Sequence, residues 1–205
     1  MGVPVVHLIT DRALCADLPA RARAALAGLP RGRAAVHLRE RDLSGRDLLT
    51  LARELLAACR EAGQLLVVND RADVALACGA DGVHLPAAGI PPAEARRLLG
   101  PSALVGVSCH SEGDVSRARA GGADWATFGP VLDTPSKRPY GPPLGFDALA
   151  RAARLGLPLV ALGGIDGSSA PAAAAAGARG VGVIRAWLAG PDPARTVAAL
   201  SAALP

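Results

Sequence analysis

Aromatic residues are scarce in this sequence of 205 residues: two Trp, two Phe and one Tyr make up 2% of it. Hydrophobic residues nevertheless reach 51%, which excludes a disordered chain and is enough to bury one substantial core. That core must therefore consist mainly of Ala, Val and Leu. Such a core suits small-residue helices that pack closely against an aliphatic sheet.

Cysteine motifs and long apolar runs are also lacking. The cysteines form no C-x-x-C pair and have no metal-ligand spacing, so we interpret them as buried thiols of a reducing cytoplasm: Cys15, Cys59, Cys78 and Cys109. No charged leader with an apolar segment opens the sequence, and no apolar stretch approaches the roughly 18 residues that cross a bilayer. We therefore expect a soluble, cytoplasmic protein that has no membrane partner.

Charge of one sign is not concentrated anywhere in the chain. The net charge of +4 results from 22 Lys and Arg against 18 Asp and Glu, and the arginines are spread along the sequence. A nucleic-acid partner needs a clustered basic patch, so no such partner is predicted. The excess of positive charge favours an anionic small molecule as the ligand.

Eight short β-branched runs recur along the chain, and segments with helical spacing lie between them. This alternation predicts a parallel sheet covered by helices. An open doubly wound sheet is the alternative, but it usually has fewer strands and often a G-x-G-x-x-G motif after the first one, where this chain reads Ile9-Thr10-Asp11-Arg12. We therefore predict a single α/β domain over residues 1–205, a (β/α)8 TIM barrel. The predicted strands are 5–9, 34–38, 65–68, 81–85, 103–107, 124–128, 158–162 and 180–184.

Polar residues recur directly after the predicted strands, strand after strand, and this regular recurrence is the evidence for a site. In a TIM barrel the chemistry lies on the loops that follow the strands, at one end of the barrel. In chain order, the polar residues at those positions are Thr10, Asp11, Arg39, Arg41, Asn69, Asp70, His84, Ser108, His110, Thr134, Ser136, Lys137 and Arg185. We expect them to form a site for a small metabolite that carries a phosphate.

Two adjacent glycines, Gly163 and Gly164, follow the seventh predicted strand, and Ile184 and Arg185 end the eighth. Adjacent glycines let backbone N–H groups approach a phosphate, and loops seven and eight commonly bind phosphate in this fold. The alternative is a pair of tight turns with no ligand. We predict a phosphate site formed by these residues.

Arg39 and Arg41 are two positions apart, so in a continuing strand they face the same way and Glu40 faces the other. Paired guanidinium groups hold a carboxylate or a phosphate through forked hydrogen bonds. The alternative is an ion pair with Asp42 or another acid. We predict that the two arginines bind an anionic group of the substrate.

His110 follows the fifth predicted strand and is placed to reach the barrel mouth, where a histidine can move protons near neutral pH. A helix-capping or bystander role is the alternative. His84 is interpreted as a satisfied core histidine at a strand end. In the long segment after the sixth strand, Thr134, Ser136 and Lys137 either close over an anion or belong to an ordinary surface loop.

These motifs resemble the superfamily of thiamine phosphate synthase and the TenI-type thiazole tautomerase, in order along essentially the whole chain. They are Ile9-Thr10-Asp11, Val36-His37-Leu38-Arg39-Glu40-Arg41, Asn69-Asp70-Arg71, Gly79-Ala80-Asp81-Gly82-Val83-His84-Leu85, Gly106-Val107-Ser108, Gly129-Pro130, Thr134-Pro135-Ser136-Lys137 and Gly163-Gly164-Ile165. The resemblance implies an enzyme of thiamine biosynthesis, a thiazole phosphate as its small-molecule partner, and a homodimer as one option.

The two activities of the superfamily differ in their need for a metal. The synthase joins a pyrimidine pyrophosphate to a thiazole phosphate with Mg²⁺. One metal ligand corresponds to Asp70, and a second acid is missing because the matching segment reads Pro86-Ala87-Ala88-Gly89. The synthase pattern also places a Gln where this chain has His37. The tautomerase relocates a proton without a metal, and its histidine corresponds to His110.

We therefore predict a metal-independent thiazole tautomerase, an isomerase, with His110 as its general acid/base and with no cofactor. The other predicted site residues bind the substrate: Arg39, Arg41, Asn69, Ser108, Thr134, Ser136, Lys137, Gly163, Gly164, Ile184 and Arg185. Two alternatives stay open. One is an Mg²⁺-dependent synthase, a transferase that binds its metal through Asp70. The other is a barrel that binds a thiazole or thiamine phosphate without catalysis.

Overall fold

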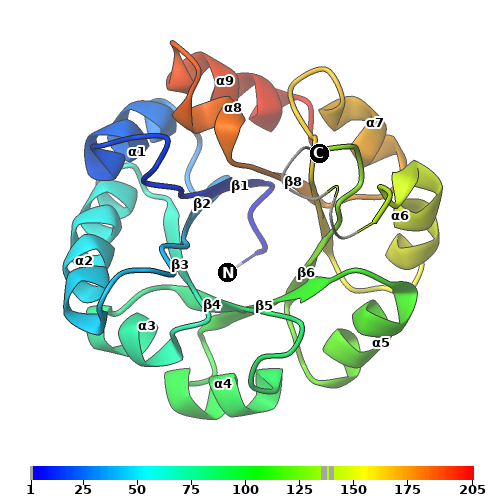
Figure 1. Cartoon of the computed structure of the whole chain (residues 1–205), viewed down its shortest axis with the longest axis horizontal. Helices are drawn as coiled ribbons and strands as arrows, with labels where there is room; N and C mark the ends of the chain where they lie inside the picture. Colours follow the sequence, from blue (N-terminus) through cyan, green and yellow to red (C-terminus); the bar gives the residue numbers. More distant parts are fainter. Residues whose placement is uncertain (1, 135–137, 139–140) are drawn as a thin grey trace.

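The strands form a closed barrel in the computed structural model, which describes residues 2–134, 138 and 141–205. Each strand pairs in parallel with its sequence neighbours, and β8 closes the ring by pairing Val181 with Val6 of β1 (Figure 1). The strands are β1 (Val6–Ile9), β2 (Ala34–Leu38), β3 (Leu65–Asn69), β4 (Gly82–Leu85), β5 (Leu104–Cys109), β6 (Trp125–Phe128), β7 (Leu159–Leu162) and β8 (Gly180–Val183). The predicted TIM barrel is therefore confirmed.

Helices cover the outside of the ring and alternate with the strands, as the sequence predicted (Figure 1). In the described ranges they are α1 (Leu18–Leu26), α2 (Gly45–Glu61), α3 (Ala72–Cys78), α4 (Pro92–Leu99), α5 (Glu112–Ala120), α6 (Gly145–Ala153), α7 (Ala170–Ala175), α8 (Arg185–Leu188) and α9 (Pro193–Ala202). The last helix, α9, contacts α1, so the two ends of the helical layer meet.

The predicted strand ends agree with the observed ends to within two residues, and β2 matches completely. Local capping explains where several helices begin. The hydroxyl groups of Ser44 and Ser111 accept hydrogen bonds from the backbone N–H groups of Asp47 and Asp114, at 3.2 and 3.1 Å. A serine N-cap of this kind satisfies one of the free donors of the first turn and fixes the start of the helix.

The sheet separates two sets of buried side chains. Its outer face and the helices share the main core, which is built mostly from Ala, Val and Leu. A smaller cluster fills the inside of the barrel and consists of Ala35, Leu65, Val67, Leu104, Trp125 and Val160. Three histidines are buried as well: His7, His37 and His84. Because side chains alternate along a strand, the residues two positions from these also face inward.

Trp125 is the largest side chain inside the barrel, and it depends on a glycine in the neighbouring strand. A Cβ atom at Gly106 would lie 2.3 Å from Cε2 of Trp125, much closer than any real contact. The indole therefore occupies the space that a side chain on β5 would need. At this level of the barrel, one large ring fills the space left by one missing side chain, in a core that has few aromatic residues.

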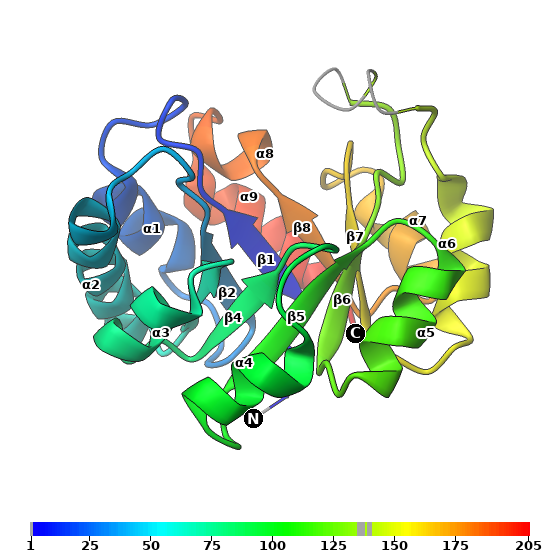
Figure 2. The same cartoon turned by 60° about the horizontal axis from the view of Figure 1, so that its bottom comes forward.

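The N-terminal segment closes the end of the barrel opposite the strand tips. Figure 2 shows the segment that leads into β1 at one end of the barrel and the residues that directly follow β6 at the other. Val3 packs against the inner cluster, and the carbonyl oxygen of Pro4 lies 3.0 Å from Nε2 of His7. Val3 and Pro4 are thus part of the barrel interior.

The cysteines are free thiols, but only two of the four are buried, which corrects the expectation for Cys15 and Cys78. Burial raises the pKa of the Cys59 thiol to about 12, so this thiol stays protonated near neutral pH. Within the ranges that the structure describes, no helix combines the length and the apolar character that crossing a membrane requires.

Candidate functional site

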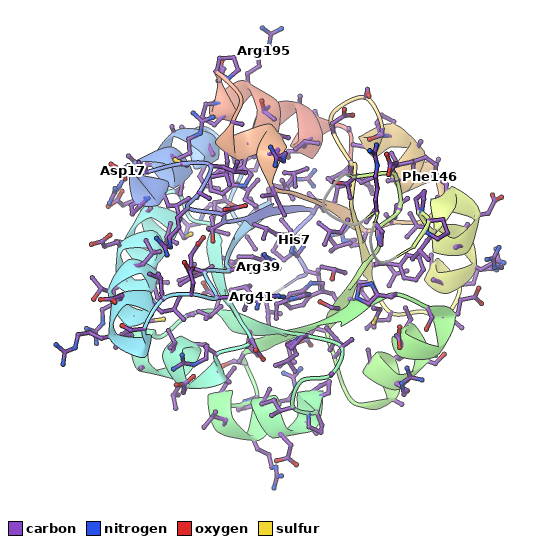
Figure 3. The ribbon with its side chains drawn as sticks, viewed as in Figure 1. His7, Asp17, Arg39, Arg41, Phe146 and Arg195 are labelled. Carbon is purple, nitrogen blue, oxygen red and sulfur yellow. The ribbon has the colours of Figure 1, made fainter. Side chains whose placement is uncertain are left out.

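The carboxyl ends of the strands bring the predicted site residues to one end of the barrel. Asn69 follows the inward-facing Val67 by two positions on β3, and Ser108 follows Leu104 by four on β5, so both face inward near the mouth. Arg39 comes directly after β2. In Figure 3 the side chains of Arg39 and Arg41 project over the interior of the ring, close to His7 in this view.

A cavity of about 370 Å³ opens between the ends of β2, β3 and β4. It brings together three of the predicted residues, Arg41, Asn69 and Asp70, and it is also lined by Glu40. A smaller cavity of about 160 Å³ contains Ser108 and adjoins the first one, because Pro86 lines both.

A larger hollow of about 770 Å³ lies elsewhere, and most of its lining comes from the outer helices α1 and α2. In TIM barrels the chemistry occurs at the carboxyl ends of the strands. We therefore place the candidate site at the mouth, although its cavities are smaller.

Within the described ranges neither Arg39 nor Arg41 has a carboxylate oxygen within 4.0 Å, although the charges of Asp11 and Glu40 act on Arg39. The acid that the sequence offered as a partner, Asp42, pairs with Arg12 instead. Burial, and after it the nearby charge of Arg41, lowers the pKa of Arg39. The arginine pair is thus a cationic centre that an anion would stabilise.

Glu40 separates the two arginines, and its carboxylate is held away from them. β2 ends at Leu38, so these residues lie beyond the strand. Both carboxylate oxygens of Glu40 accept the backbone N–H of Arg12 at 3.2 Å, and the residue is 7% exposed. The buried acid therefore joins the loops after β1 and β2.

Asp70 has an unusual backbone conformation between β3 and α3. Its φ is +64°, and among the described residues no other non-glycine residue has a positive φ. Its N–H donates to the carbonyl of His84 at 2.9 Å, and this bond holds the residue in place. Such a conformation costs about 1–3 kcal/mol and is often kept for a function, so Asp70 is a candidate functional residue on structural grounds.

The oxygen atoms near Asp70 fit a magnesium site that a substrate completes. In the part of the chain that the structure describes, no cluster of three or more His, Cys, Asp or Glu could hold a metal by itself. However, Mg²⁺ commonly binds one or two carboxylates and takes its other ligands from water and substrate phosphates. Asp70 with the amide oxygen of Asn69 meets that requirement, because both line the same cavity.

The position of the missing second acid is a tight turn. The N–H of Gly89 donates to the carbonyl of Pro86 at 2.9 Å, and a Cβ atom at Gly89 would lie 2.9 Å from Cδ of Pro86. The turn therefore has no room for an acidic side chain unless it shifts. Asp70 is then the main carboxylate that this site offers to a metal.

Gly163 and Gly164 are required by the backbone itself. Their φ values are +96° and +69°, and a Cβ atom on either would lie 2.7 Å from an atom of Pro130 or Leu132 in the connection after β6. The tight-turn interpretation therefore accounts for both glycines without any ligand. Whether the loop also binds phosphate depends on its N–H groups.

Those N–H groups are free to bind an anion. No acceptor among the described residues pairs with the backbone N–H groups of 163–165 or of 184–186. The two segments are neighbours, because they follow the paired strands β7 and β8. Arg185 is exposed at the start of α8. A group of free backbone donors beside a cation suits a phosphate, and the prediction of a phosphate site there stays a prediction.

His110 lies directly after β5 and is anchored at both its backbone and its ring. Its N–H donates to a carboxylate oxygen of Asp114 at 3.0 Å, and its Nδ1 lies 2.6 Å from the carbonyl oxygen of Gly129. Because a carbonyl can only accept, Nδ1 carries the proton and Nε2 is left for a ligand. His84, in contrast, is buried, with Nε2 3.2 Å from the hydroxyl oxygen of Thr127, in agreement with its interpretation as a core residue.

The segment after β6 is placed only in part. Thr134 is partly exposed, whereas Ser136 and Lys137 lie outside the described residues. The base of the segment is closed by hydrogen bonds from Leu144 N–H to the Pro130 carbonyl and from Gly145 N–H to the Val131 carbonyl, at 2.8 and 3.0 Å.

Sequence reasoning missed His7, a polar residue of the interior. It lies in the middle of β1 and faces the inside of the barrel (Figure 3). Its Nδ1 lies 2.7 Å from Nε2 of His37. The signal in the sequence was the alternation along the strand, which places His7 on the inward face. A polar residue that faces inward on one strand needs a partner from another.

Comparison with known proteins adds to this geometry. The family model for thiamine monophosphate synthase, TMP-TENI, matches residues 6–187. The chain belongs to this family. A putative thiamine-phosphate synthase from Geobacter sulfurreducens is 50% identical over 203 residues, which cover 98% of this chain and 94% of that protein. A thiamine-phosphate synthase from Roseiflexus sp. is 41% identical over 206 residues, which cover 99% and 86% of the two chains.

Solved structures agree with the family assignment. Thiamine phosphate pyrophosphorylase from Pyrococcus furiosus has a TM-score of 0.86 and 30% identity, and the match covers 97% of this chain and 94% of that one. A 3-hexulose-6-phosphate synthase matches with a TM-score of 0.70 and 18% identity, which supports the fold alone. The protein is thus a thiamine-biosynthesis enzyme of the thiamine phosphate synthase family.

The prediction of a thiazole tautomerase, an isomerase, is wrong. Relatives at 40–50% identity are named thiamine-phosphate synthase, a transferase. The prediction gave too much weight to the acid missing at Gly89. Magnesium can complete its coordination with water and pyrophosphate oxygens, so one absent carboxylate does not remove the chemistry of the synthase.

Proposed function

We propose that this protein is a thiamine-phosphate synthase, which joins a pyrimidine pyrophosphate to a thiazole phosphate and releases pyrophosphate. The observation that carries the proposal is the cationic centre of Arg39 and Arg41, with no carboxylate partner in the described ranges, beside Asn69 and Asp70. The names of the relatives support the same reaction. A site for one small phosphate alone would not need two free guanidinium groups at the opposite side of the mouth from the 163–165 loop.

The reaction makes specific demands on the site. The bond between a carbon of the pyrimidine substrate and pyrophosphate breaks, and both electrons leave with the pyrophosphate. The lone pair of the thiazole nitrogen forms the new carbon–nitrogen bond. No proton is gained or lost in this exchange, so the protein has to align the two substrates and stabilise the charge on the leaving group.

The cationic centre meets the second demand. Burial and the charge of Arg41 lower the pKa of Arg39, and a pyrophosphate between the two guanidinium groups would stabilise them because the anion offsets their repulsion. Mg²⁺, when bound through Asp70 and Asn69, would neutralise further charge on the pyrophosphate. In this proposal the metal is the cofactor of the enzyme.

The remaining predicted residues are assigned as substrate contacts. The free N–H groups of 163–165 and 184–186, with Arg185, bind the phosphate of the thiazole substrate. His110 is assigned a substrate contact through Nε2, and Ser108, which lines the smaller cavity, is assigned another. Thr134, in the connection after β6, is assigned to the same site, whereas the predicted roles of Ser136 and Lys137 lie outside the described residues.

The test is a coupled assay on the purified protein. The two substrates are mixed with the enzyme, with Mg²⁺ or with EDTA, and phosphorus NMR follows pyrophosphate while chromatography follows thiamine phosphate. We expect both products in equal amounts, and only with Mg²⁺. Equal turnover in EDTA would remove the metal from the proposal. A protein that binds both substrates but forms no product would refute the proposed function.

A further inference from the structure

Three polar groups form a chain of hydrogen bonds along the inside of the barrel. The carbonyl oxygen of Pro4, at the closed end, lies 3.0 Å from Nε2 of His7. The other ring nitrogen of His7, Nδ1, lies 2.7 Å from Nε2 of His37. Both distances are those of hydrogen bonds, and both rings are almost completely buried.

The chain fixes the position of the proton on each ring. A carbonyl oxygen can only accept, so Nε2 of His7 must carry a hydrogen. Burial lowers the pKa of His7 to about 4, so near neutral pH this ring has one proton and Nδ1 has a lone pair. Nε2 of His37 must then donate to that lone pair. Burial also lowers the pKa of His37 well below its usual value, so its remaining nitrogen, Nδ1, is an acceptor.

Nδ1 of His37 reaches the solvent only slightly, because the residue is 2% exposed. It has no hydrogen-bond partner among the described residues. It is also not a fully enclosed atom, because in the described ranges Trp125 Nε1 is the one side-chain nitrogen or oxygen that is both enclosed and without a partner. The ring of His37 lies next to that of His84, with centroids 5.3 Å apart, at the base of the mouth. Arg39 also lies nearby, since its charge contributes to lowering the pKa of His84.

We infer that His7 is a positioning residue that holds His37 in one tautomer, so that Nδ1 of His37 accepts a hydrogen bond from an N–H or O–H donor on the ring of a bound substrate. The identity of the substrate rests on the proposed function, whereas the tautomer rests on the barrel interior alone. We call this chain of hydrogen bonds, from Pro4 through His7 to His37, the relay. It runs from the closed end of the barrel to the site, so residues that do not contact the substrate determine that the site offers an acceptor. A ring that offers only an acceptor at this point would be rejected, since two acceptors would then face each other.

The tautomer can be measured directly. Nitrogen NMR of protein with labelled histidine distinguishes a protonated ring nitrogen from an unprotonated one. In the wild type near neutral pH we expect His37 with a protonated Nε2 and an unprotonated Nδ1. His7→Phe removes the acceptor and should give a mixture of tautomers at His37. His7→Gln is the matched control, because its amide can donate to Pro4 and accept from His37, and it should keep the wild-type pattern.

Kinetics provide the second readout. In His7→Phe we expect the KM of one substrate to rise by the inverse of the fraction of His37 whose Nδ1 is unprotonated, about two-fold for an even mixture of tautomers, with a smaller change in kcat. His7→Gln should restore the wild-type KM. His37→Leu, which removes the acceptor altogether, should raise this KM about ten-fold, the size expected when one hydrogen bond is lost, and His37→Gln, which keeps an acceptor, should not.

The outcomes separate the relay from the proposed function. A wild-type protein that forms no product but has the expected tautomer refutes the proposed function and leaves the relay intact. A wild-type His37 protonated at Nδ1 overturns the relay, whatever the activity. An unchanged tautomer in a folded His7→Phe protein overturns the role of His7, as does a KM that does not respond to either His7 variant.

Discussion

Mild acid should destabilise this protein strongly, because the barrel interior holds His7, His37 and His84 as neutral rings. Burial lowers the pKa of His7 to about 4 and that of His84 to about 3, and it lowers the pKa of His37 in the same direction. In the unfolded chain each ring returns to an ordinary pKa near 6.5. Protons therefore bind to the unfolded state first, and the stability that is present above pH 6.5 is lost as the pH falls towards the folded pKa values.

The magnitude follows from the pH interval. At about pH 5 an unfolded histidine is about 1.5 units below its pKa, whereas the folded rings remain mostly neutral, so each histidine lowers the free energy of unfolding by about 2 kcal/mol. The three together would lower it by about 6 kcal/mol, which is comparable with the whole stability of many domains of about 5–15 kcal/mol. Between about pH 6 and 5 we expect the free energy of unfolding to fall with a slope that corresponds to the uptake of nearly three protons on unfolding.

The assay is urea unfolding at several pH values from about 7.5 to 5, followed by circular dichroism. His7→Gln removes one of the titrating rings and should lower the slope by about one proton, or about 1.4 kcal/mol per pH unit. Gly167→Ala is the control, because it changes no titrating group and has open space around it, and it should leave the slope unchanged. A free energy of unfolding that is flat over this range, or a slope that His7→Gln does not change, would refute the reasoning.

Three further predictions concern the site and the core. Arg39→Ala should raise the KM of the pyrophosphate substrate about 10- to 100-fold, the cost of a lost charge-assisted hydrogen bond, whereas the exposed Arg97→Ala should leave it unchanged in the same assay. Asp70→Asn tolerates a positive φ but loses the carboxylate, so a titration of activity should require at least about ten-fold more Mg²⁺, and an unchanged requirement would argue against Asp70 as a metal ligand. Gly106→Ala should lower the free energy of unfolding by about 1–3 kcal/mol in urea because its methyl group meets the indole, whereas Gly167→Ala, which has open space around it, is the control; equal stability of the two variants would contradict the packing argument.

The fold was predictable because barrel strands are buried on both faces, so they form short apolar runs that can be recognised in the sequence. The run at 34–38 shows this, since it matches β2 completely. The order of strands and helices then limits the sheet to a parallel one, and eight units favour closure.

The candidate site was only partly predictable. Ser44 could be identified as a cap from local sequence, but the hydrogen bond between His7 and His37 joins residues that are 30 positions apart and come together only when the barrel closes. The strained φ of Asp70 is likewise set by its bond to His84 on another strand. The choice between isomerase and transferase failed because a single missing acid at Gly89 does not report how many metal ligands a substrate supplies.

The loops after β6 and β7 are locked to each other, and this has a mechanical consequence. The N–H groups of Val131 and Leu132 donate to the carbonyls of Leu162 and Gly163 at 2.9 and 3.0 Å, and Gly164 leaves no space between the two segments. Neither loop can shift alone without breaking these contacts. A phosphate that makes the 163–165 backbone more rigid would therefore also make the first residues after β6 more rigid. Binding of one substrate would then reduce the motion of a segment beside the other.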